Sequence, residues 1–272
     1  MIYPKRQISV NGVYGIVDCE RPKDYRFEGE SHPFWEFVFV RDGKVGVSAD
    51  ERVYTLSKGD VIFHKSMEFH RIWSLDGTSP KLYIFSFEAS GKLVRSLENL
   101  SIRLDADGNE ALEKLVELSR QAFELYGEGG IRSIKNEVYA QEYCNTLELF
   151  LLSLVNRTPE KVLPVNSSPD SKLFSRAVLY LRENLANKMS IEQVAEHFFV
   201  SPSRIKKLFS KYSGLGVMAY FNNMKIIEAQ KLLDEGVGIG ETAEKLGFSN
   251  QFYFSTVFKK ATGFTPTQFR RA

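Results

Sequence analysis

The sequence predicts a two-domain protein of mixed class, with an N-terminal antiparallel β-barrel followed by helices, and a C-terminal all-α domain. Three observations predict this division. Short alternating segments fill the first third of the chain, helical periodicity then replaces them, and one unit occurs twice near the C-terminus. The length of 272 residues also favours two domains. We expect the first domain at 1–156, a linker at 157–171 and the second domain at 172–272.

The strand region extends from about Ile8 to Glu88 and contains short β-branched and aromatic segments separated by turn residues. Asp42-Gly43 predicts a hairpin turn, and Lys58-Gly59-Asp60 predicts a second turn. Short strands with turns every eight to twelve residues, roughly, are typical of an antiparallel barrel or sandwich. The expected strands are 34–40, 45–47, 53–56, 61–63 and 82–87.

Helical spacing of apolar residues follows the strands. One stripe ends at Gly127 and consists of Leu112, Leu115, Val116, Ser119, Ala122, Phe123 and Tyr126. A second long helix is expected from Ile131 to about Asn156, with more apolar surface than one small barrel needs. Two interpretations stay open. The surplus caps the barrel, or it pairs with a second chain and makes a homodimer through the helices at 108–156.

The segment 157–171 contains three prolines beside Asn166-Ser167-Ser168 and is typical of a linker. Charge differs on its two sides. From Lys172 onward, 15 Lys and Arg residues stand against 8 Asp and Glu residues, a net of +7, whereas the preceding residues carry a net of −5. A basic module joined to an acidic one indicates that the C-terminal half binds a polyanion.

The repeated unit predicts two helix-turn-helix motifs. Each copy contains a short helix, a tight turn and a longer basic helix, and the matched positions include Ala195 with Ala243, Ser201 with Ser249, and Gly214 with Gly263. Ser190, Ser201 and Thr265 are expected helix N-caps. The second turn has Gly247 where a left-handed conformation is needed, and the first has Phe199. The expected buried residues of the longer helices are Ile205, Leu208, Phe209, Phe254, Val257 and Phe258.

A continuous helical pattern from Val217 to Leu233 joins the two copies. Seventeen residues would form a strut of roughly 25 Å. With the flanking turns, the two longer helices would lie about one DNA turn apart, roughly 34 Å. One chain would then contact two successive segments of the major groove.

Residues 172–272 resemble the DNA-binding domain of the AraC/XylS family of bacterial transcription regulators. The resemblance is carried by Gly247-Phe248-Ser249, Phe254, Val257-Phe258-Lys259-Lys260, Gly263-Phe264-Thr265-Pro266 and Phe269-Arg270. It implies a transcription activator that binds promoter or operator DNA and contacts RNA polymerase. The DNA-binding residues that it implies are Ser203, Arg204, Lys206, Lys207, Lys211, Gln251, Phe252, Tyr253, Thr256 and Lys260. Lysine suits guanine or phosphate, and Gln251 suits adenine. The sequence departs from the family pattern at Lys225, Phe252 and Thr256.

The segment from His32 to His70 resembles the small barrel of the cupin superfamily, the usual sensor domain of these regulators. That resemblance implies a small-molecule effector, with His32, Trp35, Glu36, His70 and Tyr83 as its expected contacts. Metal-binding cupins carry a histidine where this chain has Glu30, so we expect no metal and no other cofactor. The alternative is a divalent ion held by Glu30, His32, Glu36 and His70. The remaining histidines, His64 and His197, are expected to be incidental.

Other classes of function find little support. Cys19 and Cys144 are the only cysteines, so neither a zinc knuckle nor a disulfide scaffold is indicated. No signal peptide is visible, and the apolar stretch 147–155 is too short to span a bilayer, so we expect a cytoplasmic protein without a membrane partner. No nucleophile–base pair stands out, so we expect no catalytic residues and no enzyme. The alternatives are a metal-dependent cupin enzyme with a regulatory or localising helical domain, and a ligand-independent DNA-binding protein whose barrel only dimerises.

Overall fold

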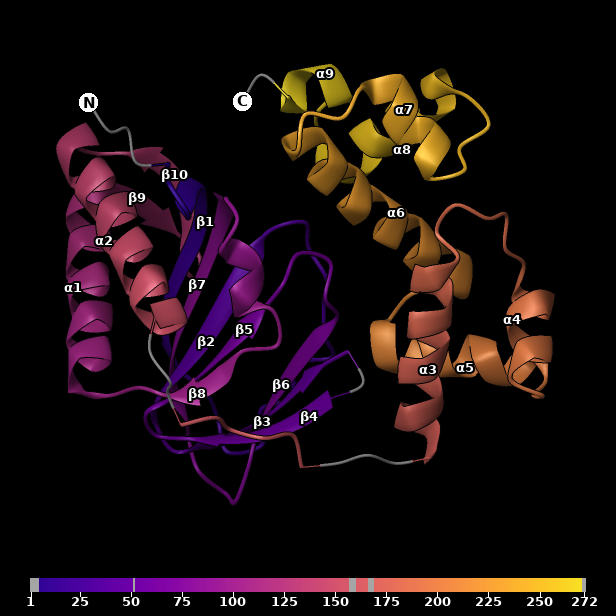
Figure 1. The fold of residues 1–272 in the computed structure, drawn as a ribbon. Coiled ribbons are helices and arrows are strands. Elements are labelled where there is room, and N and C mark those ends of the chain that lie inside the picture. The colour runs from indigo at the N-terminus through magenta and orange to yellow at the C-terminus, as the bar shows by residue number, and fades with distance from the viewer. Residues whose placement is uncertain (1–4, 51, 157–159, 166–168, 271–272) are drawn as a thin grey trace. The chain divides into compact units, whose positions relative to one another are not determined.

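The structure is a computed structural model that describes residues 5–50, 52–156, 160–165 and 169–270. The chain divides into two compact units, residues 1–166 and 167–272. Figure 1 shows that strands and two long helices build the first unit, and that the described residues of the second unit form helices. The predicted division into a strand-rich part and a helical part is confirmed.

Two antiparallel sheets face each other in the first unit. The larger has the strand order β8-β5-β2-β7-β1-β10-β9, and the smaller has the order β4-β3-β6. The strands are β1 (Ser9–Glu20), β2 (Trp35–Asp42), β3 (Lys44–Ala49), β4 (Arg52–Ser57), β5 (Asp60–His64), β6 (His70–Ser74), β7 (Lys81–Ser90), β8 (Ser101–Arg103), β9 (Phe123–Tyr126) and β10 (Gly130–Ile134).

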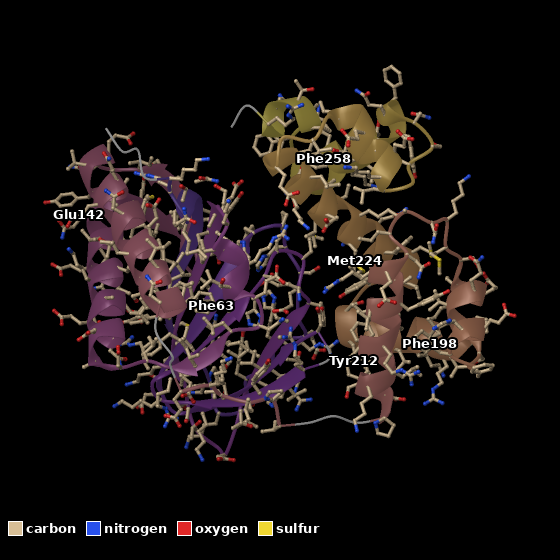
Figure 2. The ribbon with its side chains drawn as sticks, in the orientation of Figure 1. Phe63, Glu142, Phe198, Tyr212, Met224 and Phe258 are labelled. Carbon is tan, nitrogen blue, oxygen red and sulfur yellow. The ribbon has the colours of Figure 1, made fainter. Side chains whose placement is uncertain are left out.

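Successive side chains of β2 point to opposite faces of the sheet, so they pack in different cores. Phe37 and Phe39 face the helices α1 (Ala106–Ala122) and α2 (Glu137–Asn156), in a core that also contains Phe63 (Figure 2). Val38 and Val40 face the other way and pack with apolar residues of the smaller sheet. The first unit therefore has three layers: two helices, a seven-stranded sheet and a three-stranded sheet.

Asp42-Gly43 does not close a hairpin, contrary to the sequence prediction. Strand β2 pairs with β5 and β7, whereas β3 pairs with β4 and β6. The turn therefore carries the chain from the larger sheet to the smaller one. Gly43 has a φ of 77°, and an added Cβ would lie 2.9 Å from the Cα atom of Pro80. The glycine is needed for this crossing, which explains why the residues look like a hairpin turn.

Residues 123–134 form a hairpin, which corrects the prediction of helix on both sides of Gly127. β9 pairs with β10, and β10 joins the sheet at β1, where the Ile16 N–H donates to the Gly129 carbonyl oxygen at 2.8 Å. Pairing with a sheet edge supplies backbone hydrogen bonds that local helical spacing does not reveal. Helix α2 begins after Asn136, whose side-chain oxygen accepts hydrogen bonds from two backbone N–H groups of the first turn.

Residues 160–165 contact the first unit, although the sequence predicted a linker there. The Val162 N–H donates to the Ser101 carbonyl oxygen, and the Val165 N–H donates to the Val53 carbonyl oxygen, both at 2.8 Å. Helix α3 (Pro169–Glu183) begins inside the expected linker, because proline is well suited to the first turn of a helix. Residues 157–159 and 166–168 of that linker lie outside the described residues.

Two apolar cores lie along one central helix of the second unit. The helices after α3 are α4 (Ile191–His197), α5 (Pro202–Ser213), α6 (Val217–Asp234), α7 (Ile239–Lys245), α8 (Gln251–Thr262) and α9 (Pro266–Phe269). Helix α6 contributes Phe221 to a core with Phe209, and Ile226 to a core with Phe254 and Phe258 (Figure 2). The predicted strut is confirmed as α6. Within the described ranges, none of the helices has the length and apolarity to cross a membrane.

Candidate nucleic-acid interface and a buried polar cluster

Helices α4–α5 and α7–α8 form two helix-turn-helix motifs, and side chains cap α4, α5 and α8. The Ser190 and Gln193 side chains cap one another's backbone N–H groups at the start of α4, and Ser201 caps α5. At the start of α8 the cap is Asn250, whose side-chain oxygen accepts a hydrogen bond from the Tyr253 N–H at 2.8 Å. The sequence repeat matched Ser249 to Ser201, so the one extra residue of the second copy falls before its cap.

The two turns have the same left-handed backbone but different residues. Gly247 has a φ of 65°, and an added Cβ would lie 2.1 Å from the Ala186 carbonyl oxygen. Phe199 has a φ of 54° although it carries a side chain, and that side chain is 96% exposed. The first turn therefore has a conformation that L-residues disfavour, and burial of the Phe199 ring does not offset the cost.

The outward face of α5 carries three exposed residues that were implied to contact bases, Ser203, Lys206 and Lys207. Arg204 and Lys211 lie on the flank next to α3, where their nitrogens are 3.1 and 4.0 Å from carboxylate oxygens of Asp170. Both pairs are exposed, so each contributes little to stability. The two flank cations remain available to a phosphate.

The corresponding face of α8 is aromatic. Phe252 is 87% exposed and Tyr253 is 54% exposed, and Gln251, Thr256 and Lys260 are also exposed. The Thr256 hydroxyl donates to the Phe252 carbonyl oxygen at 3.0 Å, within its own helix. A large apolar ring held in water at the start of a helix is typical of a surface that another molecule covers.

Lys225 joins the two motifs. It lies on α6 and is buried, and its Nζ donates to the Leu246 carbonyl oxygen at the end of α7, 2.8 Å away. The same nitrogen lies 3.5 Å from the Asn187 carbonyl oxygen, in the segment before α4. Burial lowers the pKa of this amine. One side chain therefore fixes the end of the second motif's first helix to the strut.

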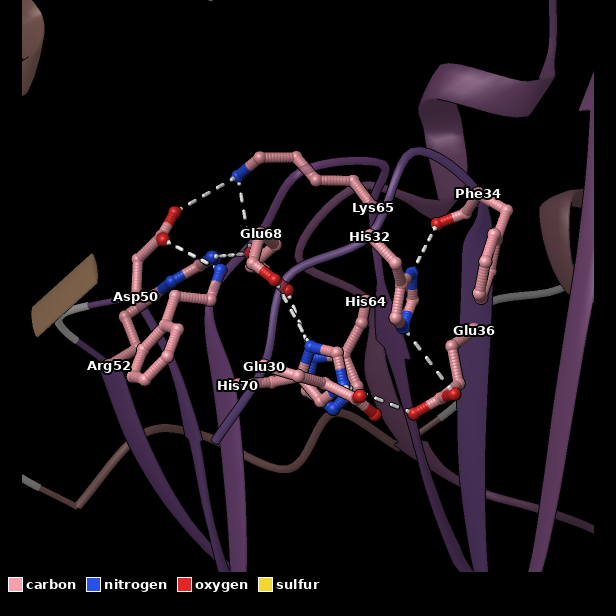
Figure 3. A network of polar contacts seen from close by, with 11 residues as sticks. Glu30, His32, Phe34, Glu36, Asp50, Arg52, His64, Lys65, Glu68 and His70 are labelled. Atoms are coloured by element: carbon pink, nitrogen blue, oxygen red, sulfur yellow. Dashed lines mark hydrogen bonds and ion pairs between the residues drawn. The ribbon is translucent and has the colours of Figure 1, made fainter. Parts of the chain in front are cut away.

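A polar cluster lies in the first unit where the two sheets meet (Figure 3). Glu36 is on β2, His70 begins β6, and Glu30 and His32 lie in the segment before β2. The Glu36 carboxylate is 3.3 Å from Nε2 of His70 and 3.5 Å from Nε2 of His32, and it accepts a hydrogen bond from the Ser86 hydroxyl at 2.9 Å. Glu30 approaches Nε2 of His70 to 3.8 Å.

Each of the two imidazoles is held through its other nitrogen. Nδ1 of His32 lies 3.1 Å from the Phe34 carbonyl oxygen, and Nδ1 of His70 lies 3.0 Å from the Glu68 carbonyl oxygen. A carbonyl oxygen only accepts, so both Nδ1 atoms donate. The Nε2 atoms of both rings are buried and face the Glu36 carboxylate, which makes an ion pair with each ring that is protonated.

A second layer surrounds Glu68, whose side chain is fully buried (Figure 3). Its carboxylate contacts Nη2 of Arg52 at 2.7 Å, Nδ1 of His64 at 3.0 Å and Nζ of Lys65 at 3.2 Å. His64 is itself buried and stacks on His70, with ring centroids 4.3 Å apart. His64, which the sequence analysis expected to be incidental, connects this layer to the first one.

The contacts of the cluster favour the ionised form of two carboxyls, Glu36 and Glu68. Burial by itself would raise the pKa of the Glu36 carboxyl, but the imidazoles of His32 and His70 outweigh burial and hold it well below its usual range. Burial would likewise raise the pKa of Glu68, yet Lys65, His64 and Arg52 lower it to about 2. For His70 the neighbouring Glu36 outweighs burial and raises the imidazole pKa.

The five expected ligand contacts are not all brought together. His32, Glu36 and His70 meet, whereas Trp35 and Tyr83 lie on the other face of the larger sheet, in the core beside α1 and α2. Trp35 precedes Glu36 on one strand, so alternation sends the two side chains to opposite faces. The Tyr83 hydroxyl donates to Glu113 of α1 at 3.1 Å, and its pKa is raised to about 12 by burial.

Sequence reasoning missed five members of the network: Arg52, His64, Lys65, Glu68 and Ser86. Ser86 lies directly opposite Glu36 in the β2–β7 register, so correct pairing of these strands would have identified it. The second-layer residues carry no comparable signal in the sequence, because their contacts depend on the turn between β5 and β6.

Two family models match separate parts of the chain. An AraC-like ligand binding domain matches residues 14–136, and a helix-turn-helix domain matches residues 194–272. Together they correspond to the main parts of the two structural units.

Curated relatives are similar over different lengths. The arabinose operon regulatory protein of Escherichia coli is 34% identical over 128 residues, which are 46% of this chain and 42% of the relative. The chain thus spans less than half of this relative. The transcriptional activator RhaR of Shigella dysenteriae is 24% identical over 260 residues, 94% of this chain and 90% of the relative. Among solved structures, the C-terminal domain of AraT, a response regulator from Geobacillus stearothermophilus, is 33% identical and covers 38% of this chain and 88% of that one, with a TM-score of 0.36.

Proposed function

This chain belongs to the AraC family of transcription regulators, and we propose that it binds promoter or operator DNA under the control of a small ligand. The observation that carries the proposal is the pair of equivalent exposed faces on α5 and α8, which one strut connects and Lys225 ties together. A protein with one helix-turn-helix needs a dimer to contact two segments of the groove, whereas this chain has two such motifs. We propose no catalytic role, in keeping with relatives that are named as regulators.

Helix α6, the strut, sets the spacing between the exposed faces of α5 and α8. Helix α6 has 18 residues and is about 27 Å long. Adding the turns at its ends brings the separation of the two second helices toward one turn of DNA, about 34 Å. The chain would therefore recognise an asymmetric site with two elements on one face of the duplex.

Different chemistry on the two helices predicts different elements. On α5, Lys206 and Lys207 suit the O6 and N7 acceptors of guanine. On α8, Gln251 suits adenine, while the rings of Phe252 and Tyr253 suit thymine methyl groups. We assign Arg204, Lys211 and Lys260 to phosphates, since they lie beside these outward faces.

The N-terminal unit supplies the control in this proposal. A ligand bound there would shift the population of chains able to engage DNA with both motifs. Helix α2 exposes Val138 and Leu149, at 74% and 68%, and they are 11 residues apart on nearly the same face of the helix. We propose that this stripe makes a homodimer, and that the DNA-bound protein acts in the cytoplasm as an activator that contacts RNA polymerase.

Selection of bound sequences from random duplex DNA tests the proposal. The wild type should enrich a site with two elements about one turn apart. Lys206→Ala should degrade only the element that α5 contacts, and Gln251→Ala only the other, because each side chain reads bases in one groove segment. Binding without enrichment would contradict the proposal.

Lys260→Gln is the matched control for a phosphate contact. It should weaken binding to all sequences alike and leave the selected site unchanged. The slope of log affinity against log salt should become less steep by about 0.9, the value of one released counterion.

A further inference from the structure

An open cleft of the first unit is lined mostly by charged side chains. It has a volume of about 710 Å³ and lies where the ends of β2 and β8 and the start of β7 meet the first turns of α1. Its charged lining residues are Arg41, Asp42, Lys58, Lys81, Arg103 and Glu113. We propose that this cleft binds the phosphate group of a small organic phosphate. Its role as an effector site rests on the proposed function, whereas phosphate binding is measured without DNA.

The charge of the lining gives the first argument. Four cations and two carboxylates give the cleft a net of +2, although the residues before Lys172 together carry a net of −5. Cations that gather at a concave surface of an otherwise acidic unit attract an anion. Lys58 and Lys81 are exposed, and within the described ranges neither of them makes an ion pair. Their charges are therefore available to a ligand.

The two arginines of the cleft are held in place by their own partners. Arg41 pairs with Asp18, and its guanidinium lies over the Tyr83 ring, 4.3 Å from the ring centre. Nε of Arg103 donates to the Asp60 carboxylate at 2.9 Å. A guanidinium carries five N–H groups in a planar fork that suits a phosphate, so each arginine keeps donors for a ligand. These contacts orient both cations before a ligand arrives.

Helix α1 provides groups for the rest of the ligand. Asn109 and Glu113 lie one turn apart on this helix, and both line the cleft. The Glu113 carboxylate accepts a hydrogen bond from the Tyr83 hydroxyl at 3.1 Å and has further lone pairs. A carboxylate and an amide suit ligand hydroxyl groups, and the carboxylate repels a second anionic group. We therefore expect one phosphate on a molecule that also carries hydroxyl groups.

The cleft is separate from the polar cluster around Glu36. Arg41 follows Glu36 by five residues on β2, about 17 Å along the strand. Phe39, which lines the cleft, belongs to the core next to α1 and α2, whereas the polar cluster lies where the two sheets meet. A ligand in the cleft would thus contact a different set of residues.

Strand β8 connects the cleft to the segment that continues toward the second unit. Arg103 ends this strand, and its backbone N–H donates to the Glu160 carbonyl oxygen at 3.0 Å. The Val162 N–H donates to the Ser101 carbonyl oxygen of the same strand at 2.8 Å. A ligand that holds the Arg103 side chain would therefore stabilise the pairing of β8 with residues 160–162.

Calorimetric titration of the full-length protein, in a phosphate-free buffer of constant ionic strength, tests the proposal. The probes are glucose 6-phosphate, inorganic phosphate and glucose. Glucose 6-phosphate should bind at one site per chain, inorganic phosphate should compete for that site, and glucose should not bind, because the phosphate carries the charge. Lys58→Gln and Lys81→Gln should each weaken binding by about 10-fold, the value of one hydrogen bond to a charged group.

Two exposed lysines outside the cleft provide matched controls. Lys92 lies just beyond the other end of β7, and Lys206 lies on the outward face of α5. Lys92→Gln and Lys206→Gln should bind glucose 6-phosphate as the wild type does. Hydrogen exchange at the Arg103 and Val162 amides should become slower when glucose 6-phosphate is bound, because their hydrogen bonds join β8 to residues 160–162.

Three outcomes would overturn the proposal. They are the absence of saturable phosphate binding, full affinity in the double variant Lys58→Gln/Lys81→Gln, and an equal loss in either control. Binding without slower exchange at the two amides would refute the connection through β8. Sequence-specific DNA binding is measured separately. A protein that selects DNA but binds no phosphate would refute this inference alone, and one that binds phosphate but selects no DNA would refute the proposed function alone.

Discussion

The Nζ atom of Lys225 donates a hydrogen bond to the carbonyl oxygen of Leu246, 2.8 Å away, and so connects the strut to the end of α7. Lys225→Met keeps most of the side chain's apolar stem but leaves this carbonyl without its donor. The free energy of unfolding of the second unit should fall by roughly 2 kcal/mol, the value of a hydrogen bond to a charged group. Urea unfolding of the full-length protein, with hydrogen exchange in α6 and α7 as the readout, measures this fall in stability.

Lys231→Met is the control, because Lys231 lies on the same helix and only pairs with Glu228 at a half-buried site. It should change stability by less than about 0.5 kcal/mol. Equal losses in the two variants would show that the contact with Leu246 has no special role.

At Phe199, a substitution to glycine should increase the stability of the second unit. The φ of 54° is costly for a residue with a side chain, and the ring is almost fully exposed. Phe199→Gly should therefore raise the free energy of unfolding of the second unit by about 1 kcal/mol. Thermal unfolding by scanning calorimetry measures the change.

Gly247→Ala is the opposite test at the matching turn. Its new Cβ would lie 2.1 Å from the Ala186 carbonyl oxygen, so the backbone must move and the second unit should lose stability. A loss in Phe199→Gly, or no loss in Gly247→Ala, would contradict the account of the two turns.

The buried hydroxyl of Tyr143 should make the stability of the first unit depend on pH in the alkaline range. Tyr143 is fully buried, its hydroxyl has no hydrogen-bond partner, and burial raises its pKa well above the usual value. The unfolded chain loses this proton near pH 10, while the folded chain keeps it. The free energy of unfolding of the first unit should therefore fall as the pH rises above about 10. Tyr143→Phe should reduce the loss of stability above about pH 10.

The same variant should also stabilise the protein at neutral pH, by about 1 kcal/mol, because the unsatisfied hydroxyl is removed from the core. Unfolding measured at neutral and alkaline pH, with Tyr126→Phe as an exposed control, separates the two effects. An unchanged alkaline profile would refute the role of Tyr143.

Leu149 tests the homodimer. It is 68% exposed on the same side of α2 as Val138. If this stripe pairs two chains, Leu149→Glu would place a charge in an apolar interface, and sedimentation should shift from dimer to monomer. Glu142→Gln, a change of a partly exposed polar residue of the same helix that pairs with Lys114 of α1, should leave the dimer intact. A wild type that is monomeric at all concentrations would contradict the proposal.

Local features of the fold could be predicted from the sequence. Ser190, Ser201 and Thr265 cap helices as expected, because a cap depends on residues within one turn. The strut and the buried stripes of α5 and α8 also follow from spacing alone. The positions assigned to DNA came from the family resemblance, and Ser203, Lys206 and Gln251 are among those that the structure leaves exposed.

Pairing between distant segments could not be predicted in this way. Asp42-Gly43 looks like a hairpin turn, but β2 finds its partners 20 or more residues away in sequence. The β9–β10 hairpin depends on an edge that β1 provides. The cupin resemblance implied that Trp35 and Glu36 contact one ligand, although adjacent strand residues point to opposite faces of the sheet. The contacts of Glu68 depend on a turn whose path the sequence does not specify.

Hydroxyl-radical footprinting of the wild type on its selected site tests the central claim most directly. We predict two protected patches about one helical turn apart on one face of the duplex, produced by a single chain. Lys206→Ala should remove one patch and Gln251→Ala the other. A single patch, affected by only one of the two variants, would contradict the claim that both motifs of one chain engage DNA together.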